Sequence, residues 1–218
     1  MFEMNIDIQA LIPLFVAVPL AMAMLIQIVA RHRHATAETL NIIAMLALSV
    51  MSWLCIGHQG IYSLGGWPTP IGIDMRLDAL ATLLLLVVSI VGLAISLYAV
   101  DYMRRFSARS HFYSLFLLMV AGMNGVILAG DLFNLYVTLE LLGLSAVALA
   151  ALGGSAPALR AALRYLILGL LGSLAFLAGV ALVYARYGTL DLASLAGLVG
   201  PEPAAWVALA LMTTGLLI

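Results

Sequence analysis

The stretch Leu77-DALATLLLLVVSIVGLAISLYAVD-Tyr102 carries one acidic residue near each end and is almost wholly apolar in between. A bilayer core about 30 Å thick is crossed by about 20 apolar residues in a helix, so this stretch is long enough to span a membrane. The rest of the chain is similar, because 65% of its 218 residues are hydrophobic and 9% are charged, against roughly 25% charged in a soluble domain. The sequence therefore predicts an all-α, polytopic transmembrane helix bundle.

Apolar stretches of this kind predict about seven spans in a single membrane domain, residues 1–218. They lie at about 8–30, 39–57, 77–102, 111–129, 131–152, 158–185 and 204–218. The first follows acidic residues rather than a basic segment, which favours a true span over a signal peptide. The last is shorter than a comfortable span. We therefore expect either that a partner chain completes this helix or that the sequence is a fragment of a longer protein.

The arginines predict the orientation of the bundle. The side reached after the first, third and fifth spans holds seven of them, namely Arg31, Arg33, Arg104, Arg105, Arg109, Arg160 and Arg164. The opposite side holds Arg76 and Arg186. By the positive-inside rule the Arg-rich side is cytoplasmic and the N-terminus lies outside. The outer loop at 62–74 is rich in Gly, Pro and aromatic residues, which predicts a short extended turn or β-hairpin between the second and third spans.

Composition excludes several classes of function. A net charge of −1 leaves no basic surface for a phosphate backbone, so nucleic-acid binding is excluded. The single cysteine, Cys55, excludes a disulfide framework and a thiolate metal site. The four histidines are scattered along the sequence and suggest no metal site, so we expect no cofactor in this chain. No long polar stretch leaves room for a separate soluble catalytic domain.

Glu140 is the most informative single residue. It lies nine residues after Asp131, or about 13 Å below the outer end of its span. A carboxylate at that depth costs several kcal/mol unless it is paired or hydrated, so an intramembrane acid is a candidate functional group. We interpret Glu140 as a proton-loading acid. The alternative is a protonated glutamate that packs against a neighbouring helix as a structural hydrogen-bonding group.

Arg164 is the second candidate, about two turns into the sixth span and one turn after Arg160. The sequence leaves two interpretations open: an electrostatic modulator of Glu140, or a side chain that extends to the cytoplasmic headgroups. Measured along the membrane normal, Arg164 is expected about 9 Å nearer the cytoplasm than Glu140. That separation is too long for a direct ion pair without helix tilt, but a chain of water molecules could couple the two.

Three further polar residues are candidates for a proton path. Asp101 lies three residues before Arg104, so it is either half of an interfacial ion pair or a proton entry point. Asn124 and Thr138 lie at mid-membrane, where they could hold water molecules or form hydrogen bonds between helices. Other aspartates have a simpler interpretation, since Asp78 and Asp131 each stand just before a span and are expected to cap its N-terminus.

The run His111-FYSLFLLMVAGMNGVILAGDLFNLYVTLELLGL-Ser145 resembles the fourth and fifth helices of the antiporter-like membrane subunits. These subunits occur in Mrp-type cation/proton antiporters, membrane-bound hydrogenases and respiratory complex I. The segment Gly130-DLFN-Leu135 most resembles the Mrp D-type branch. Further matching motifs are Gly65-GWPTPIG-Ile73, Leu163-RYLILGLLG-Ser173 and Tyr187-GTL-Asp191.

The resemblance implies that Glu140 pairs with a lysine on helix 7 and gates proton movement along a hydrated axis at mid-membrane. Here the sequence departs from the family, because all nine of its basic residues are arginine and it stops within helix 7, about where the lysine would follow. The early basic residue of helix 6, frequently lysine in the family, is Arg164. Family members run to about fourteen helices built from two inverted repeats, of which this chain would hold part of the first.

The sequence thus predicts a proton- or cation-translocating antiporter-like subunit in a multisubunit complex of a bacterial or archaeal inner membrane. Its partners would be other membrane subunits and, in the respiratory types, redox subunits that carry any oxidoreductase activity. The transported ions would be protons, with sodium as a second candidate. The alternative is a non-conducting scaffold subunit or split half of such a complex. A stand-alone solute carrier is disfavoured, because a substrate site needs several converging polar groups.

Overall fold

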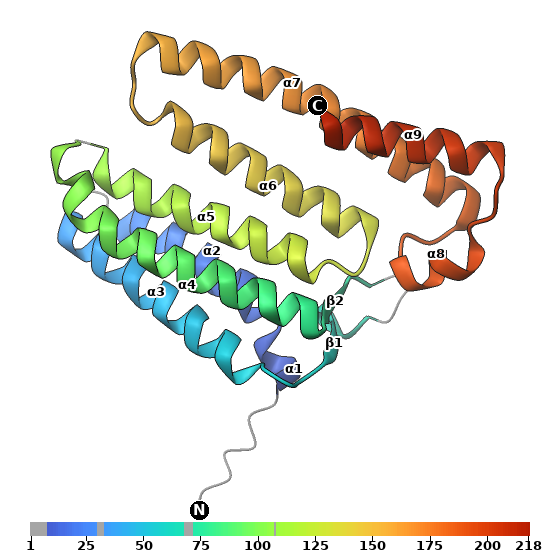
Figure 1. Cartoon of the computed structure of the whole chain (residues 1–218), viewed down its shortest axis with the longest axis horizontal. Helices are drawn as coiled ribbons and strands as arrows, with labels where there is room; N and C mark the ends of the chain where they lie inside the picture. Colours follow the sequence, from blue (N-terminus) through green and yellow to red (C-terminus); the bar gives the residue numbers. More distant parts are fainter. Residues whose placement is uncertain (1–7, 30–32, 68–71, 107) are drawn as a thin grey trace, which may run out of the picture.

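The computed structural model describes residues 8–29, 33–67, 72–106 and 108–218, and its long helices lie side by side (Figure 1). The elements run in the order α1 (Ile8–Leu11), α2 (Leu14–Val29), α3 (His34–Leu54), β1 (Gly60–Ser63), η1 (Leu64–Gly66), β2 (Asp74–Leu77), α4 (Ala79–Tyr102), η2 (Met103–Arg105), α5 (Arg109–Leu128), α6 (Leu132–Ala151), α7 (Ala156–Tyr187), α8 (Leu192–Leu198) and α9 (Pro203–Leu217).

Six helical segments among the described residues are long and apolar enough to cross a membrane. They are α1 with α2, α3, α4 with η2, α5, α6 and α7, and the predicted seventh span is the shorter helix α9, of 15 residues. The predicted all-α membrane bundle is therefore confirmed. Most of the arginines lie near one end of the bundle, where α3, α5 and α7 begin, here called the Arg-rich end. The other end, which carries the strands and α8, is called the hairpin end (Figure 1).

Several boundaries differ from the prediction. The first span is interrupted by a turn at Ile12 and Pro13, where proline cannot supply the backbone N–H that a continuous helix would use. Helix α3 begins at His34, before the predicted start at Thr39, so Glu38 lies inside the helix. Leu77 belongs to a strand and not to the third span. Helix α8 was not predicted, because a helix of seven residues is too short to stand out by apolar length.

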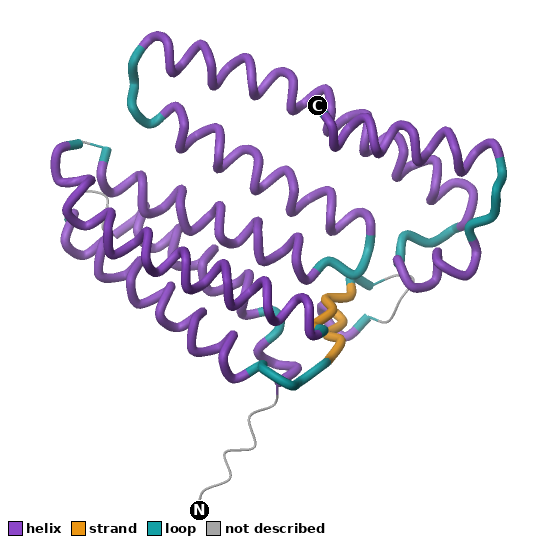
Figure 2. The backbone as a smooth tube through the Cα atoms, in the orientation of Figure 1, coloured by secondary structure: helices purple, strands orange, loops and turns teal. Residues whose placement is uncertain are grey.

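The predicted extended turn between the second and third spans is confirmed as an antiparallel hairpin (Figure 2). Strand β1 pairs with β2 in the register Gly60 with Leu77 through Ser63 with Asp74. The Ser63 hydroxyl also donates to the Asp74 carboxylate at 2.6 Å. Residues 68–71, which follow η1 in the sequence, lie outside the described part of the chain.

The helices form two apolar cores joined by α6. One core lies among α2, α3, α4 and α5 and includes the fully buried Phe15 and Leu117. The second lies among α6, α7, α8 and α9 and includes Phe176, Val180 and Ala208. Helix α5 is the central helix. In its most apolar stretch of 18 residues, 56% of the residues are buried, whereas in the corresponding stretch of α6 only 17% are buried. Much of α6 therefore has no covering helix among the described residues.

Close backbone approach fixes α6 against α5. A Cβ atom added at Gly122 of α5 would lie 2.8 Å from the backbone nitrogen of Leu142 of α6. One turn further along α5, a Cβ atom added at Gly125 would collide with the side chain of Thr138. Since backbone atoms cannot move aside as a flexible side chain can, glycine is required at the first of these positions. This contact sets how α6 presents its other face to α7.

Candidate functional site

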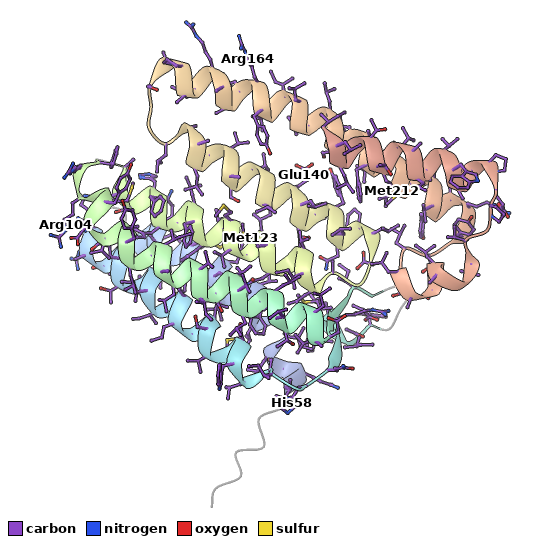
Figure 3. The ribbon with its side chains drawn as sticks, in the orientation of Figure 1. His58, Arg104, Met123, Glu140, Arg164 and Met212 are labelled. Carbon is purple, nitrogen blue, oxygen red and sulfur yellow. The ribbon has the colours of Figure 1, made fainter. Side chains whose placement is uncertain are left out.

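Glu140 lines a cavity of about 210 Å³ formed by α6, α7 and α9. In Figure 3 its side chain extends from α6 toward α7, and the carboxylate is half-buried. No hydrogen bond or ion pair reaches it within the described ranges of the chain. The cavity is otherwise mostly apolar and is lined by Tyr136, Leu139, Gly143, Leu144, Val147, Tyr165, Leu166, Gly169, Leu170, Ser173, Phe176, Gly215, Leu216 and Ile218.

The nearest polar groups on the cavity wall are hydroxyls. Tyr136 lies one turn before Glu140 on α6, and its ring stacks on Phe176 of α7 with the centroids 6.4 Å apart. Ser173 of α7 donates a long hydrogen bond of 3.5 Å to the Tyr136 hydroxyl. An acid in an apolar cavity with a few hydroxyls can take up and release a proton through water without meeting a fixed counter-charge.

The structure does not bring Arg164 to Glu140. The Arg164 side chain is exposed, points away from α6 in Figure 3, and is absent from the cavity wall. Arg160 is exposed as well. Both guanidinium groups lie toward the Arg-rich end of α7, as the interpretation of extended side chains at the cytoplasmic headgroups requires. Any influence of Arg164 on Glu140 would therefore be indirect.

The three candidates for a proton path are also separate from this cavity. Asp101 is exposed and pairs with Arg104 at 3.3 Å. Asn124 is 2% exposed and donates to the backbone carbonyl of Phe15 at 2.8 Å, which ties α5 to α2. The Thr138 hydroxyl donates to a backbone carbonyl one turn earlier in its own helix. For Asp101 and Asn124 the geometry matches the structural interpretation given above, whereas the Thr138 hydroxyl bonds within α6 and not to another helix.

The two predicted N-caps are confirmed. The Asp78 carboxylate accepts from the backbone nitrogen of Ala81 at 2.7 Å, at the start of α4. Asp131 accepts in the same way from Asn134, also at 2.7 Å, at the start of α6. The helix that carries Glu140 is thus anchored at its hairpin end by a carboxylate.

An ion pair that the sequence analysis did not identify joins α3 to α5 near the Arg-rich end. Glu38 and Arg109 form it with side chains that are 11% and 15% exposed, respectively. Arg109 also donates to the carbonyl of Val100 at 3.2 Å. One signal was available, since His34, Glu38 and Asn41 follow the i, i+4, i+7 spacing of a single helix face. Pairing between distant helices is not visible in that spacing.

A second unpredicted feature is the joining of three segments at the hairpin end, here called the three-segment junction and made of 74–76, 129–132 and 189–194. The backbone nitrogen of Gly130 donates to Asp74, that of Leu132 to Leu190, and that of Leu192 to Gly130, at 2.9, 3.0 and 3.1 Å. Isolated antiparallel bridges link Met75 with Ala129 and Asp131 with Asp191. The hairpin, the start of α6 and the segment before α8 are therefore held together by main-chain bonds.

Asp191 is the most fully bonded carboxylate of the junction. Arg76 donates to its Oδ1 at 2.7 Å, and the backbone and hydroxyl of Ser194 donate to its Oδ2 at 2.7 and 2.6 Å. Burial disfavours the charged form of Asp191, but the bonds from Ser194 and the Arg76 guanidinium together lower its pKa. An aspartate just before a short apolar segment was a capping signal in the sequence.

Asp131 is in the opposite electrostatic situation. Burial raises its pKa, the N–H groups of Asn134 and Phe133 act against that rise, and the nearby charges of Asp191 and Asp74 add to it. Its Oδ2 is buried and has no hydrogen-bond partner in the described structure.

Two family models match the chain. Residues 67–113 match the N-terminal model of chain 5 of NADH-ubiquinone oxidoreductase (complex I), and residues 129–218 match the transmembrane model of NADH:quinone oxidoreductase and Mrp antiporters. The N subunit of the NADH-quinone oxidoreductase of Desulforudis audaxviator is 39% identical over 94% of this chain and 42% of its own. The D subunit of a probable K⁺/H⁺ antiporter of Rhizobium meliloti is 44% identical over 63% of this chain and 25% of its own.

Solved structures agree with these relatives. A chain of the membrane-bound sulfane sulfur reductase, an archaeal respiratory membrane complex, superposes with a TM-score of 0.89 at 32% identity, over 95% of this chain and 44% of that one. A chain of the Mrp complex from Dietzia sp. DQ12-45-1b superposes with a TM-score of 0.85 at 28% identity, over 97% and 41%. The chain thus spans less than half the length of these relatives. Taken together, the matched segments, the relatives and the shared fold show that the chain belongs to the family of antiporter-like membrane subunits.

Proposed function

We propose that this protein forms part of a proton- or cation-translocating antiporter-like subunit within a multisubunit complex, and that Glu140 is its proton-loading acid. The observation that carries the proposal is the position of Glu140. It is a half-buried acid in a membrane helix, without a counter-charge among the described residues, on the wall of a cavity between three helices. An unpaired carboxylate in such a place is costly, which fits a group that alternates between a protonated and an ionised form.

The cationic partner of Glu140 is proposed to come from outside these 218 residues. All nine basic residues are arginine, and Arg164, the nearest candidate by sequence, does not line the cavity. A longer chain or a neighbouring subunit would supply the cation. Its approach would favour the ionised form of Glu140 and its withdrawal the protonated form. Arg164 would then act at a distance, through the field at the Arg-rich end.

The partners are proposed to be other membrane subunits, in the inner membrane of a bacterium or archaeon. The relatives support two kinds of complex, since one is named as a subunit of NADH-quinone oxidoreductase and another as a subunit of a probable K⁺/H⁺ antiporter. In the first kind, any redox cofactor would belong to partner subunits. In the second, the counter-ion would be sodium or potassium. Purification from the native membrane in mild detergent, followed by identification of co-migrating chains, distinguishes the two kinds.

The test of transport is Glu140→Gln in the intact complex, assayed in membrane vesicles. Proton movement is followed with a pH-sensitive dye, either on addition of sodium or potassium or during respiration. The matched control is Glu202→Gln, which removes an exposed glutamate paired with Arg186 at 2.7 Å. We expect Glu140→Gln to abolish coupled proton movement, because the amide cannot take up a proton, while the amount of assembled complex stays normal. Glu202→Gln should transport as the unmodified protein does.

Two results would contradict the proposal. Transport at the normal rate in an assembled Glu140→Gln complex would favour the non-conducting scaffold. Failure of that variant to assemble, with Glu140→Ala failing in the same way, would favour a structural role for the glutamate.

A further inference from the structure

The three-segment junction contains two aspartates that lie opposite each other on neighbouring segments of the chain. The antiparallel bridge between Asp131 and Asp191 makes them a directly opposed cross-strand pair, and such pairs have their Cβ atoms about 4.5–5.5 Å apart. The two residues are 7% and 5% exposed. Like charges in this arrangement repel each other, and burial strengthens the repulsion because little water screens it.

The charges at the junction do not balance. Three buried carboxylates, Asp74, Asp131 and Asp191, share one cation, Arg76. Arg76 is bonded to Asp191, and Asp74 receives the hydroxyl of Ser63. If all three acids were ionised, the junction would hold a net charge of −2 away from water, which is unfavourable without compensation.

The hydrogen bonds single out the oxygen at which compensation is missing. Both oxygens of Asp191 accept hydrogen bonds, and so does Oδ1 of Asp131. The Oδ2 atom of Asp131 is buried and accepts none. A buried carboxylate oxygen without a donor loses its hydration and receives nothing in return.

A cavity borders this pair on one side. A cavity of about 350 Å³ is lined by both Asp131 and Asp191, together with Phe133, Tyr184 and Gly188. The charged and titratable groups placed around Asp131 are Asp74 and Arg76 from β2, Asp191 from the segment before α8, and Tyr184 from α7. Arg76 is the cation among them, and it is already engaged by Asp191.

We propose that Asp131 and Asp191 form a second proton-binding site, in which one proton resides on Oδ2 of Asp131 while Asp191 stays ionised against Arg76. The proton comes from water in the cavity and returns there as the pH rises, and no other bond changes. The site lies at the hairpin end of α6, whereas Glu140 lies more than two turns further along the same helix. It does not depend on the transport role proposed for Glu140.

Proton binding at this site stabilises the junction in a defined pH window. The raised pKa of Asp131 means that the folded protein holds this proton more tightly than the unfolded chain does. The stabilisation is complete below the unfolded value of about 3.9 and is lost as the pH rises through the folded value. Because Asp131 also caps α6, its titration changes how firmly the start of the Glu140 helix is held.

The direct test is infrared spectroscopy of protonated carboxyl groups in the detergent-solubilised protein, titrated with pH. We expect a protonated-carboxyl absorption that disappears as the pH rises, that is lost in Asp131→Asn, and that remains in Glu140→Gln. Asp78→Asn is the matched control, since it removes an exposed aspartate that caps α4 in the same way. Persistence of every protonated-carboxyl signal in Asp131→Asn would overturn the proposal.

A second variant keeps the test valid if Asp131→Asn folds poorly. Asp191→Asn removes the opposing negative charge and releases Arg76, so Asp131 should bind its proton about tenfold more weakly, a shift of about one pH unit to lower pH. An unchanged titration midpoint in Asp191→Asn would mean that the two carboxylates do not share a site, and would refute the proposal independently. Neither outcome depends on whether Glu140→Gln abolishes transport.

Discussion

The ion pair between Glu38 and Arg109 allows a quantitative test of how α3 and α5 are held together. Replacing Glu38 with alanine leaves the Arg109 guanidinium largely buried and without its counter-charge, although the Val100 carbonyl still accepts from it. The two side chains are 11% and 15% exposed, so water compensates for little of the loss. Removing one member of a buried pair costs about 3–5 kcal/mol. In a chain of this size that corresponds to a fall of roughly 6–20 °C in the unfolding midpoint.

The assay is thermal unfolding of the purified protein in one detergent at fixed pH, followed by tryptophan fluorescence. The matched control is Glu202→Ala, which breaks the pair with Arg186. Those side chains are 41% and 53% exposed, so a much smaller change is expected. The double variant with Glu38→Leu and Arg109→Met separates charge from packing. It removes both charges together, so its midpoint should return close to that of the unmodified protein.

The reasoning would be refuted by either of two outcomes. If Glu38→Ala lowered the midpoint no more than Glu202→Ala does, the buried pair would contribute little beyond an exposed one. If the double variant were as unstable as Glu38→Ala, the loss would come from packing and not from an uncompensated charge.

Two further substitutions test the contacts of α5. Gly122→Ala should destabilise the protein by about 1–3 kcal/mol, because its Cβ would lie 2.8 Å from the backbone nitrogen of Leu142. The control is Gly143→Ala, which should be neutral or slightly stabilising because nothing lies within 4 Å of the added Cβ. Thermal unfolding of both variants measures the difference. Asn124→Ala should cost about 1–3 kcal/mol, because the buried carbonyl of Phe15 loses its donor at 2.8 Å, and equal stability to the unmodified protein would show that water replaces the amide.

The parts of the fold that could be predicted are those determined by local sequence. Apolar length identified the spans, and an aspartate before an apolar run identified the caps at Asp78 and Asp131. Glycine and proline identified the hairpin. Errors fell at the edges, because a membrane helix extends into polar residues that a hydropathy criterion leaves out. Glu38 was missed for this reason, since it lies in the first turns of α3, before the predicted start, and its charge is paired with Arg109 of another helix.

The candidate site was predictable in one respect only. A single acid in an apolar helix pointed to Glu140 without knowledge of the fold. Which residues surround it could not be predicted, because α6, α7 and α9 meet through contacts between residues distant in the sequence. Arg164 shows the difficulty: its spacing placed it about 9 Å from Glu140 along the membrane normal, close enough for coupling through water, but the rotation of α7 directs it away from α6. Helical rotation is set by packing, in this case by Gly172 against Gly215 of α9.

Helix α6 combines a fixed side with an open one, and the two have different physical roles. Gly122 of α5 holds one face of α6 at backbone contact distance, Gly125 packs against the Thr138 side chain on that face, and Asp131 holds the first turn. The opposite face carries Glu140 beside a cavity of about 210 Å³. An acid that exchanges protons needs room for water and a change of electrostatic surroundings, but its position must not drift, because interaction with a charge depends steeply on distance. Because the contacts with α5 and the Asp131 cap hold α6 in place, the Glu140 carboxylate can respond to a cation without movement of the helix.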